Sequence, residues 1–226
     1  MAREIKNILV HHLFENELKR CAFAYFSGRL IDIGCGDKPY EALLLKHVAE
    51  YKGLEHKDTP HDKSKVDIWG TAYHIPVPDA SFDSAMCIAV LEHLEEPAAA
   101  LAECYRVLKP GGLAFYSAPF IWHLHEAPRD FFRYSRYGLD YLFRKAGFEI
   151  VELRALSGFW ATFGQLLVYN LYRLNRGPLR WLRIIDGIGL LLQLFFYVLN
   201  RIDKTEEWTW CYAVVARKNG AVRKPD

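Results

Sequence analysis

The sequence predicts an α/β protein built on a doubly wound, largely parallel sheet of seven strands. Three observations lead to this fold class. Short apolar segments alternate with segments of helical periodicity along most of the 226 residues. The first apolar segment, RLIDIGCG, ends in a glycine turn that a helical segment follows. The segment FDSAMCIAV is apolar nearly throughout, as expected for a parallel strand that is covered on both faces.

The elements follow in order from periodicity and from turn residues. An amphipathic helix is predicted over Ile5–Tyr25, because its apolar residues recur at helical spacing up to Ser27-Gly28. Pro97 is suited to the first turn of a helix, and Gly147 to the end of one. The predicted strands are 29–33, 51–55, 66–69, 82–90, 113–119, 148–156 and 208–218, and the predicted helices between them are 40–50, 97–108 and 135–146.

One stretch interrupts this alternation. Residues 157–205 are dense in Leu, Phe, Tyr and Trp and are broken once, at Asn175-Arg176-Gly177-Pro178, which predicts a helical hairpin inserted between strands six and seven. The chain is therefore interpreted as a single domain with an N-terminal helix (1–27), a core (28–156), an apolar helical insertion (157–205) and a last strand (206–218).

Composition excludes several classes of protein. A hydrophobic fraction of 51% with 15% aromatic residues is incompatible with disorder, and a net charge of +2 argues against a protein that wraps nucleic acid. Five cysteines without a C-x-x-C pair fit neither a zinc site nor a disulfide scaffold, and the charged N-terminus lacks the apolar core of a signal peptide. We therefore expect a cytoplasmic protein without a metal.

A ligand site is predicted where the first strand ends, since open α/β sheets bind ligands at this edge. Gly34 and Gly36 allow a sharp turn and a close approach of the ligand. A dinucleotide fingerprint would need a third glycine where Pro39 stands, and the acidic Asp32 suits an ammonium group better than a pyrophosphate.

Three blocks, in this order, carry a resemblance to a known family. LIDIGCG, YKGLE and IPVPDASFDSAMCIAVLEHLEEPAAALAECYRVLKPGGLAFYSAPF together resemble the class I S-adenosylmethionine-dependent methyltransferases of the type-11 branch. The resemblance covers about residues 28–156 and the last strand. It implies a Rossmann-like sheet whose last strand is antiparallel, S-adenosyl-L-methionine as the cofactor, and methyltransferase activity.

The resemblance also implies a set of cofactor-binding residues. Glu55, at the tip of the second strand, would accept hydrogen bonds from both ribose hydroxyls. Thr71 stands where the family usually has an Asp, so a backbone contact to the adenine is expected there. The remaining residues would line the methionine moiety, the adenine or the sulfonium: Asp32 facing the amino group, Gly34, Gly36, the small packing residue Cys35, Ala72, Ile88 and Ala89.

Methyl transfer to oxygen requires a group that takes up a proton. Candidate bases are His93, after the fourth strand, and His125 and Glu126, in the long loop after the fifth strand. Structural roles for these side chains are equally compatible with the sequence. Arg129, Asp130 and Arg133 either order this loop or bind an anionic group of the substrate.

The predicted partner is a small-molecule or lipid- or glycan-linked acceptor, with O-methylation as the expected reaction. The loop sequence HEAPRDFFRYS resembles type-11 enzymes encoded with glycan and lipid biosynthesis enzymes. The alternatives are a non-catalytic cofactor-binding partner subunit and a membrane-associated scaffold with the same fold. Three roles fit the apolar hairpin: a lid over the acceptor pocket, which we favour, a homodimer interface, or a peripheral membrane contact. Arg180, Arg183 and Asp186 interrupt it too early for a spanning helix to be expected.

Overall fold

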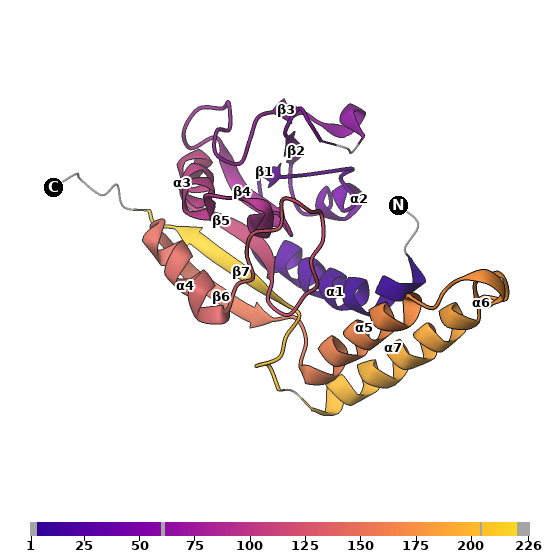
Figure 1. Cartoon of the computed structure of the whole chain (residues 1–226). Helices are drawn as coiled ribbons and strands as arrows, with labels where there is room; N and C mark the ends of the chain where they lie inside the picture. The colour runs from indigo at the N-terminus through magenta and orange to yellow at the C-terminus, as the bar shows by residue number, and fades with distance from the viewer. Residues whose placement is uncertain (1–3, 60–61, 204, 221–226) are drawn as a thin grey trace. The chain divides into compact units, whose positions relative to one another are not determined.

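The computed structural model describes residues 4–59, 62–203 and 205–220. A seven-stranded sheet runs through it in the order β3-β2-β1-β4-β5-β7-β6 (Figure 1). Its strands are β1 (Arg29–Ile33), β2 (Glu50–Glu55), β3 (Ile68–Trp69), β4 (Phe82–Ile88), β5 (Leu108–Pro119), β6 (Phe148–Ala155) and β7 (Cys211–Lys218).

Strands β3, β2, β1, β4 and β5 pair in parallel, and β7 is antiparallel to its neighbours β5 and β6. The predicted fold class is therefore confirmed. The chain reverses its direction of winding at β1, which pairs with β2 on one side and with β4 on the other. Ligands bind at such a switch point, outside the carboxyl ends of the strands.

The helices are η1 (Ile5–Asn7), α1 (Ile8–Tyr25), α2 (Glu41–Leu44), η2 (Lys63–Lys65), η3 (Leu91–His93), α3 (Pro97–Val107), α4 (Arg136–Lys145), α5 (Phe159–Tyr172), α6 (Gly177–Trp181) and α7 (Ile184–Ile202). Pro97 begins α3 as predicted. The Ser135 hydroxyl accepts a hydrogen bond from the Gly138 amide and caps α4.

Several predictions were wrong in extent. Strands β3, β4 and β7 are two or three residues shorter than predicted, and three further elements differ more. The helix expected over 40–50 is the short α2, because the amides of Ala49 and Glu50 already bond to the carbonyl of Gly28 to begin β2. Strand β5 starts at Leu108 rather than Leu113, since Leu108 pairs with Phe82 across a register shift. The hairpin contains a third short helix, α6.

The described chain forms two compact units. The sheet unit comprises Lys19–Pro119, Leu124–Arg154 and the residues from Tyr212. The hairpin unit comprises the residues up to Leu18, Phe120–His123 and Ala155–Cys211. In the sheet unit the core is made by both faces of the central strands, with Leu30, Ile31, Met86 and Phe115 fully buried.

Two buried glutamines lie in the interior of the hairpin unit, beside the buried apolar side chains of Val168, Ile185 and Phe196. Gln193 is 2% exposed, and its amide accepts a hydrogen bond from the Leu9 amide and donates to the Ile5 carbonyl. Gln165 is fully buried and donates to the Lys6 carbonyl. Helices α5 and α7 approach closely at Gly164, where an added Cβ would lie 2.5 Å from the Phe196 ring.

The outward side of the hairpin is apolar. Six exposed side chains recur along α7 at alternating spacings of four and three residues: Ile184, Ile188, Leu191, Phe195, Val198 and Ile202. By length and composition alone, α7 is long and apolar enough to cross a membrane, and 22% of its apolar stretch is buried. Core helices of soluble proteins meet the same criteria. Of the charges that were expected to interrupt a spanning helix, Arg180 and Arg183 precede α7, and Asp186 lies in its first turn.

Candidate functional site

A cavity of about 210 Å³ lies at the carboxyl ends of β1, β2 and β4 in the sheet unit. Its walls combine apolar side chains with a few polar groups, which is typical of ligand sites. It is lined by Ile33, Gly34, Leu54, Glu55, His56, Asp58, Gly70, Thr71, Ala72, Tyr73, Val90, His93, Leu94, Glu95 and Arg129.

Glu55 is the buried carboxylate of this cavity. It ends β2 and is 7% exposed. Its Oε2 accepts a hydrogen bond of 3.0 Å from the Gly36 amide, and its Oε1 accepts one of 3.0 Å from its neighbour His56. A carboxylate offers about four acceptor positions, so both oxygens retain capacity for a pair of hydroxyl groups.

The turn after β1 brings the backbone to the edge of the cavity. Gly34 has a φ of +78°, and an added Cβ would lie 2.6 Å from Val90 Cγ2. The amides of Gly34 and Cys35 both donate to the Leu54 carbonyl, at 3.0 and 3.1 Å. Only glycine meets both the conformational and the steric requirement at position 34.

Asp32 is buried inside β1 and does not line the cavity. The Tyr51 hydroxyl donates to its carboxylate. Burial raises the pKa of Asp32 to about 7, while the Tyr51 hydrogen bond and the Lys38 ammonium oppose the shift. Burial, followed by the charges of Asp32 and Glu55, also raises the pKa of the Cys35 thiol to about 12, so Cys35 is no nucleophile at neutral pH.

The other predicted cofactor residues divide into two groups. Thr71 and Ala72 line the cavity, as Gly34 and Glu55 do. Ile88 ends β4, and Cys35, Gly36 and Ala89 lie in the turns after β1 and β4; none of the four is among the lining residues. Ala89 has a φ of 50°, a conformation that is costly for a residue with a Cβ, and its amide donates to Ser117 Oγ at 3.1 Å.

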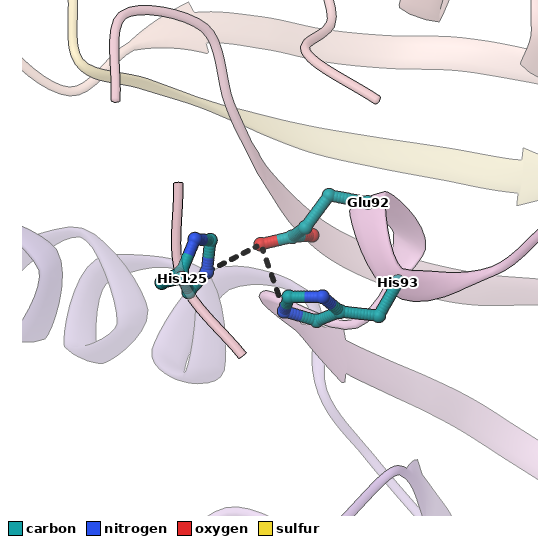
Figure 2. A group of neighbouring side chains, drawn as sticks. All are labelled: Glu92, His93 and His125. Atoms are coloured by element: carbon teal, nitrogen blue, oxygen red, sulfur yellow. Dashed lines mark ion pairs between the residues drawn. The ribbon is translucent and has the colours of Figure 1, made fainter. Parts of the chain in front are cut away.

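Two of the three predicted bases, His93 and His125, come together at a fourth residue, Glu92 (Figure 2). Glu92 and His93 lie on η3, and His125 reaches them from the loop after β5. The Nε2 atoms of His93 and of His125 each lie 3.9 Å from Glu92 Oε1. Glu126 Oε2 lies 3.6 Å from His93 Nε2, and the Glu126 side chain is 70% exposed.

Hydrogen bonds to backbone carbonyls hold the loop against η3. The amides of Phe131 and Phe132 donate to the Glu92 carbonyl at 2.9 and 3.2 Å. The Tyr134 hydroxyl donates to the Leu91 carbonyl at 3.0 Å. His93 Nδ1 contacts the Arg129 carbonyl. Positions that are far apart in sequence therefore form one preorganised group of side chains.

Arg133 and Asp130 form an ion pair that orders the same loop. Arg133 donates to the two carboxylate oxygens of Asp130 at 2.6 and 2.7 Å, and the His125 amide donates to Asp130 at 2.9 Å. The Arg133 hydrogen bonds lower the pKa of Asp130 well below its usual range. This supports the loop-ordering role of the pair, while Arg129 lines the cavity.

Glu92 is the site residue that sequence reasoning missed. Its carboxylate is 1% exposed, and burial raises its pKa to about 8. The only signal in the sequence is its place beside His93 in LEHL. His123, a further histidine of the loop, belongs to the hairpin unit, where its ring lies 4.7 Å from that of Tyr169.

The residues that line the cavity fit S-adenosylmethionine. Its adenine requires apolar walls, which Ile33, Leu54, Ala72, Val90 and Leu94 provide, and its ribose requires acceptors for two hydroxyls, which Glu55 provides. The buried carboxylate of Asp32, one residue before the lining begins, suits a cationic group.

Comparison with known proteins supports the same cofactor. Residues 31–116 match the model of the methyltransferase domain family, type 11. The chain is 36% identical over 115 residues to a probable S-adenosylmethionine-dependent methyltransferase of Mycolicibacterium smegmatis, covering 47% of this chain and 42% of that protein. It is 26% identical over 113 residues to the ubiquinone biosynthesis O-methyltransferase of Shewanella halifaxensis, covering 45% and 48%. The chain thus spans less than half the length of these relatives.

A solved structure supports the fold over a longer range. The crystal structure of the cyclase SpnF covers 91% of this chain and 82% of its own, with a TM-score of 0.60 and 20% identity. At this identity the likeness shows the fold alone. The strand order, the matched segment and the named relative lead to one conclusion: over residues 31–116 the chain is similar to the class I S-adenosylmethionine-dependent methyltransferases.

Proposed function

We propose that this protein transfers a methyl group from S-adenosylmethionine to a hydroxyl oxygen of a small-molecule or lipid- or glycan-linked acceptor. One observation carries the proposal: His93 lines the cofactor cavity and also belongs to the cluster of Glu92, His125 and Glu126. Groups that can take up a proton therefore stand next to the predicted methyl donor. A relative named for O-methylation supports oxygen as the acceptor atom.

When bound, the cofactor supplies a methyl carbon already activated by its sulfonium, so that the S–CH₃ bond breaks as the O–CH₃ bond forms. The chain itself must hold the acceptor in line and take the hydroxyl proton. In this proposal Glu55 holds the ribose, and the cluster at His93, His125 and Glu126 receives the proton. The Arg133–Asp130 ion pair keeps His125 in place.

Formation of S-adenosylhomocysteine tests the proposal. The protein is incubated with S-adenosylmethionine and a panel of hydroxyl acceptors, including catechols and polyprenyl-linked saccharides. An acceptor-dependent release of S-adenosylhomocysteine, with the methyl group on oxygen by mass spectrometry, is expected. Cofactor binding without turnover on the whole panel would favour a non-catalytic partner subunit, and a methyl group on nitrogen would contradict the acceptor atom.

We further propose that the hairpin contacts a membrane surface, which supports a lipid-linked acceptor. The outward side of the hairpin is apolar: Leu191 is 69% and Phe195 57% exposed, although Val168, Ile185 and Phe196 already form an apolar interior with the hydrogen-bonded Gln165 and Gln193. A helix surface in water is polar on its outward side.

Charge at the tip of the hairpin fits a bilayer better than a second copy of the chain. Arginines 173, 176, 180 and 183 are all exposed around α6, where Trp181 is 83% and Leu182 57% exposed. Basic residues interleaved with Trp and Leu are typical of helices that lie in the interface of anionic membranes. Four arginines at the tip would repel their symmetry mates in a tip-to-tip dimer.

A further inference from the structure

We propose that Glu92, His93 and His125 bind a first-row divalent transition-metal ion, such as Zn²⁺, beside the cofactor cavity. Their candidate ligand atoms all lie within 4.8 Å of one another. Figure 2 shows both imidazoles directed at the same carboxylate oxygen, Glu92 Oε1. The residues come from η3 and from the loop after β5, both in the sheet unit.

Two of the three groups that converge here, Glu92 and His93, present buried acceptor atoms without a hydrogen-bond donor. Within the described residues, neither oxygen of the Glu92 carboxylate has a hydrogen-bond partner, nor does His93 Nε2, and all three atoms are buried. Because His93 Nδ1 faces the Arg129 carbonyl, Nδ1 carries the proton and Nε2 presents a lone pair. A lone pair and a buried carboxylate therefore face each other.

A cation bound between Glu92 and His93 would give the carboxylate and the imidazole lone pair a common partner. An unpartnered buried carboxylate is costly, and buried charges in proteins are usually paired or bound to metals. Imidazole nitrogen with carboxylate oxygen is a donor set that suits Zn²⁺ and Fe²⁺.

The spacing is close to that of a metal site. Ligand atoms on one tetrahedral Zn²⁺ lie roughly 3.3 Å apart, given bond lengths of about 2.0–2.1 Å. The two Nε2 atoms lie 3.9 Å from Glu92 Oε1. Small side-chain rotations would shorten these distances to those of a bound ion, because all the candidate ligand atoms lie within 4.8 Å of one another.

The surroundings of both imidazoles fit metal ligands. His125 Nδ1 lies 3.4 Å from Asp130 Oδ2, so a carboxylate can hold the Nδ1 proton when Nε2 binds a cation. Metal-bound histidines usually donate their second N–H to a carboxylate or a carbonyl. The Arg133 guanidinium, a donor only, also lies 3.5 Å from His125 Nδ1, so binding of a cation at Nε2 requires Nδ1 to turn from this long contact to Asp130. Arg133 keeps its two short hydrogen bonds to Asp130.

The site has an open side. Glu126 Oε2 lies 3.6 Å from His93 Nε2 on an exposed side chain, and catalytic metal sites keep a position for substrate. A hydroxyl bound there would lose its proton more easily, and Glu126 would receive it. This catalytic role rests on the proposed function, and it makes His93 and His125 ligands rather than bases. The binding itself does not depend on methyl transfer.

Titration calorimetry with ZnCl₂ alone tests the site. The whole protein is stripped with a chelator and dialysed, and neither cofactor nor acceptor is added. We expect one ion per chain, with affinity lowered more than about 100-fold in Glu92→Gln and in His125→Gln, since loss of a supporting residue alone costs about 10–100-fold. Co²⁺ should give a d–d absorption band in the wild type that both variants lose. His12→Gln, on helix α1, is the control and should bind as the wild type does.

Wild-type affinity in a folded Glu92→Gln variant would overturn the proposal, and so would the absence of stoichiometric binding by the wild type. Circular dichroism shows whether each variant is folded, and His125→Gln remains informative if Glu92→Gln is not. Zn²⁺ binding without methyl transfer would contradict the proposed function alone. Methyl transfer that persists in the stripped protein, together with no Zn²⁺ binding, would contradict the metal site alone.

Discussion

Glu55 Oε2 accepts a 3.0 Å hydrogen bond from the amide of Gly36, which joins the tip of β2 to the turn after β1. Through this bond the buried Glu55 carboxylate, which lines the cavity, also holds the turn after β1 in place. A substitution at position 55 is therefore expected to affect cofactor binding more than stability, because the remaining bonds of the turn run to the Leu54 backbone.

Glu126→Gln should lower turnover on a hydroxyl acceptor by roughly 10²–10⁴-fold, the usual contribution of a general base. The Kd for the cofactor should not change, because Glu126 does not line the cavity. Steady-state kinetics and calorimetry measure the two quantities. Glu149→Gln, at an exposed position of β6, is the matched control. Unchanged turnover in Glu126→Gln would remove Glu126 from the mechanism.

Asp32 should make the free energy of unfolding fall as the pH rises from about 4 to about 7. The folded protein keeps the Asp32 proton up to about pH 7, whereas the unfolded chain releases it near the ordinary value. Between these values the folded state binds more protons, so its stability is lost with rising pH. Asp32→Asn should flatten this part of the profile.

Urea unfolding at pH 4, 5.5 and 7.5 measures the effect as the difference between wild type and variant. Asp140→Asn, at an exposed helical position, should keep the wild-type slope. A steeper fall in Asp32→Asn than in the wild type would contradict the assignment of the raised pKa to this carboxyl.

The hairpin should bind anionic vesicles at low salt. Leu191→Glu with Phe195→Glu should release the protein, because two charges would enter the apolar face that contacts the lipid. Arg180→Gln with Arg183→Gln should weaken binding by about 1 kcal/mol per charge. Arg136→Gln with Arg144→Gln, on α4, should not.

Vesicle sedimentation and analytical ultracentrifugation separate the possible partners of this face. If the protein does not bind vesicles but forms a stable dimer that Leu191→Glu dissociates, membrane contact is contradicted. The row of exposed apolar residues on α7 is then a subunit interface. Its spacing of four and three residues would then serve helix pairing.

Much of the sheet unit could be predicted because its signals are local. The glycine turn after β1, the carboxylate at the end of β2 and the start of α3 at Pro97 each depend on a few adjacent residues. The burial of Glu92 could not be predicted, since it depends on Phe131 and Phe132, about forty residues away, whose amides bond to its carbonyl. The inward position of Gln193 in the hairpin was hidden for a similar reason. Gln193 is a polar residue in an apolar run, and only its bonds to Ile5 and Leu9 show that it faces inward.

Calorimetric titration with S-adenosylhomocysteine tests the central claim most directly, since every later step depends on the cofactor cavity. The wild-type protein should bind one molecule per chain. Glu55→Ala should lose about 1.5–3 kcal/mol of binding free energy, the range for hydrogen bonds to a charged group, and Glu55→Gln should lose less because it keeps one acceptor oxygen. A folded wild-type protein without measurable binding, or a folded Glu55→Ala variant with wild-type affinity, would contradict the account.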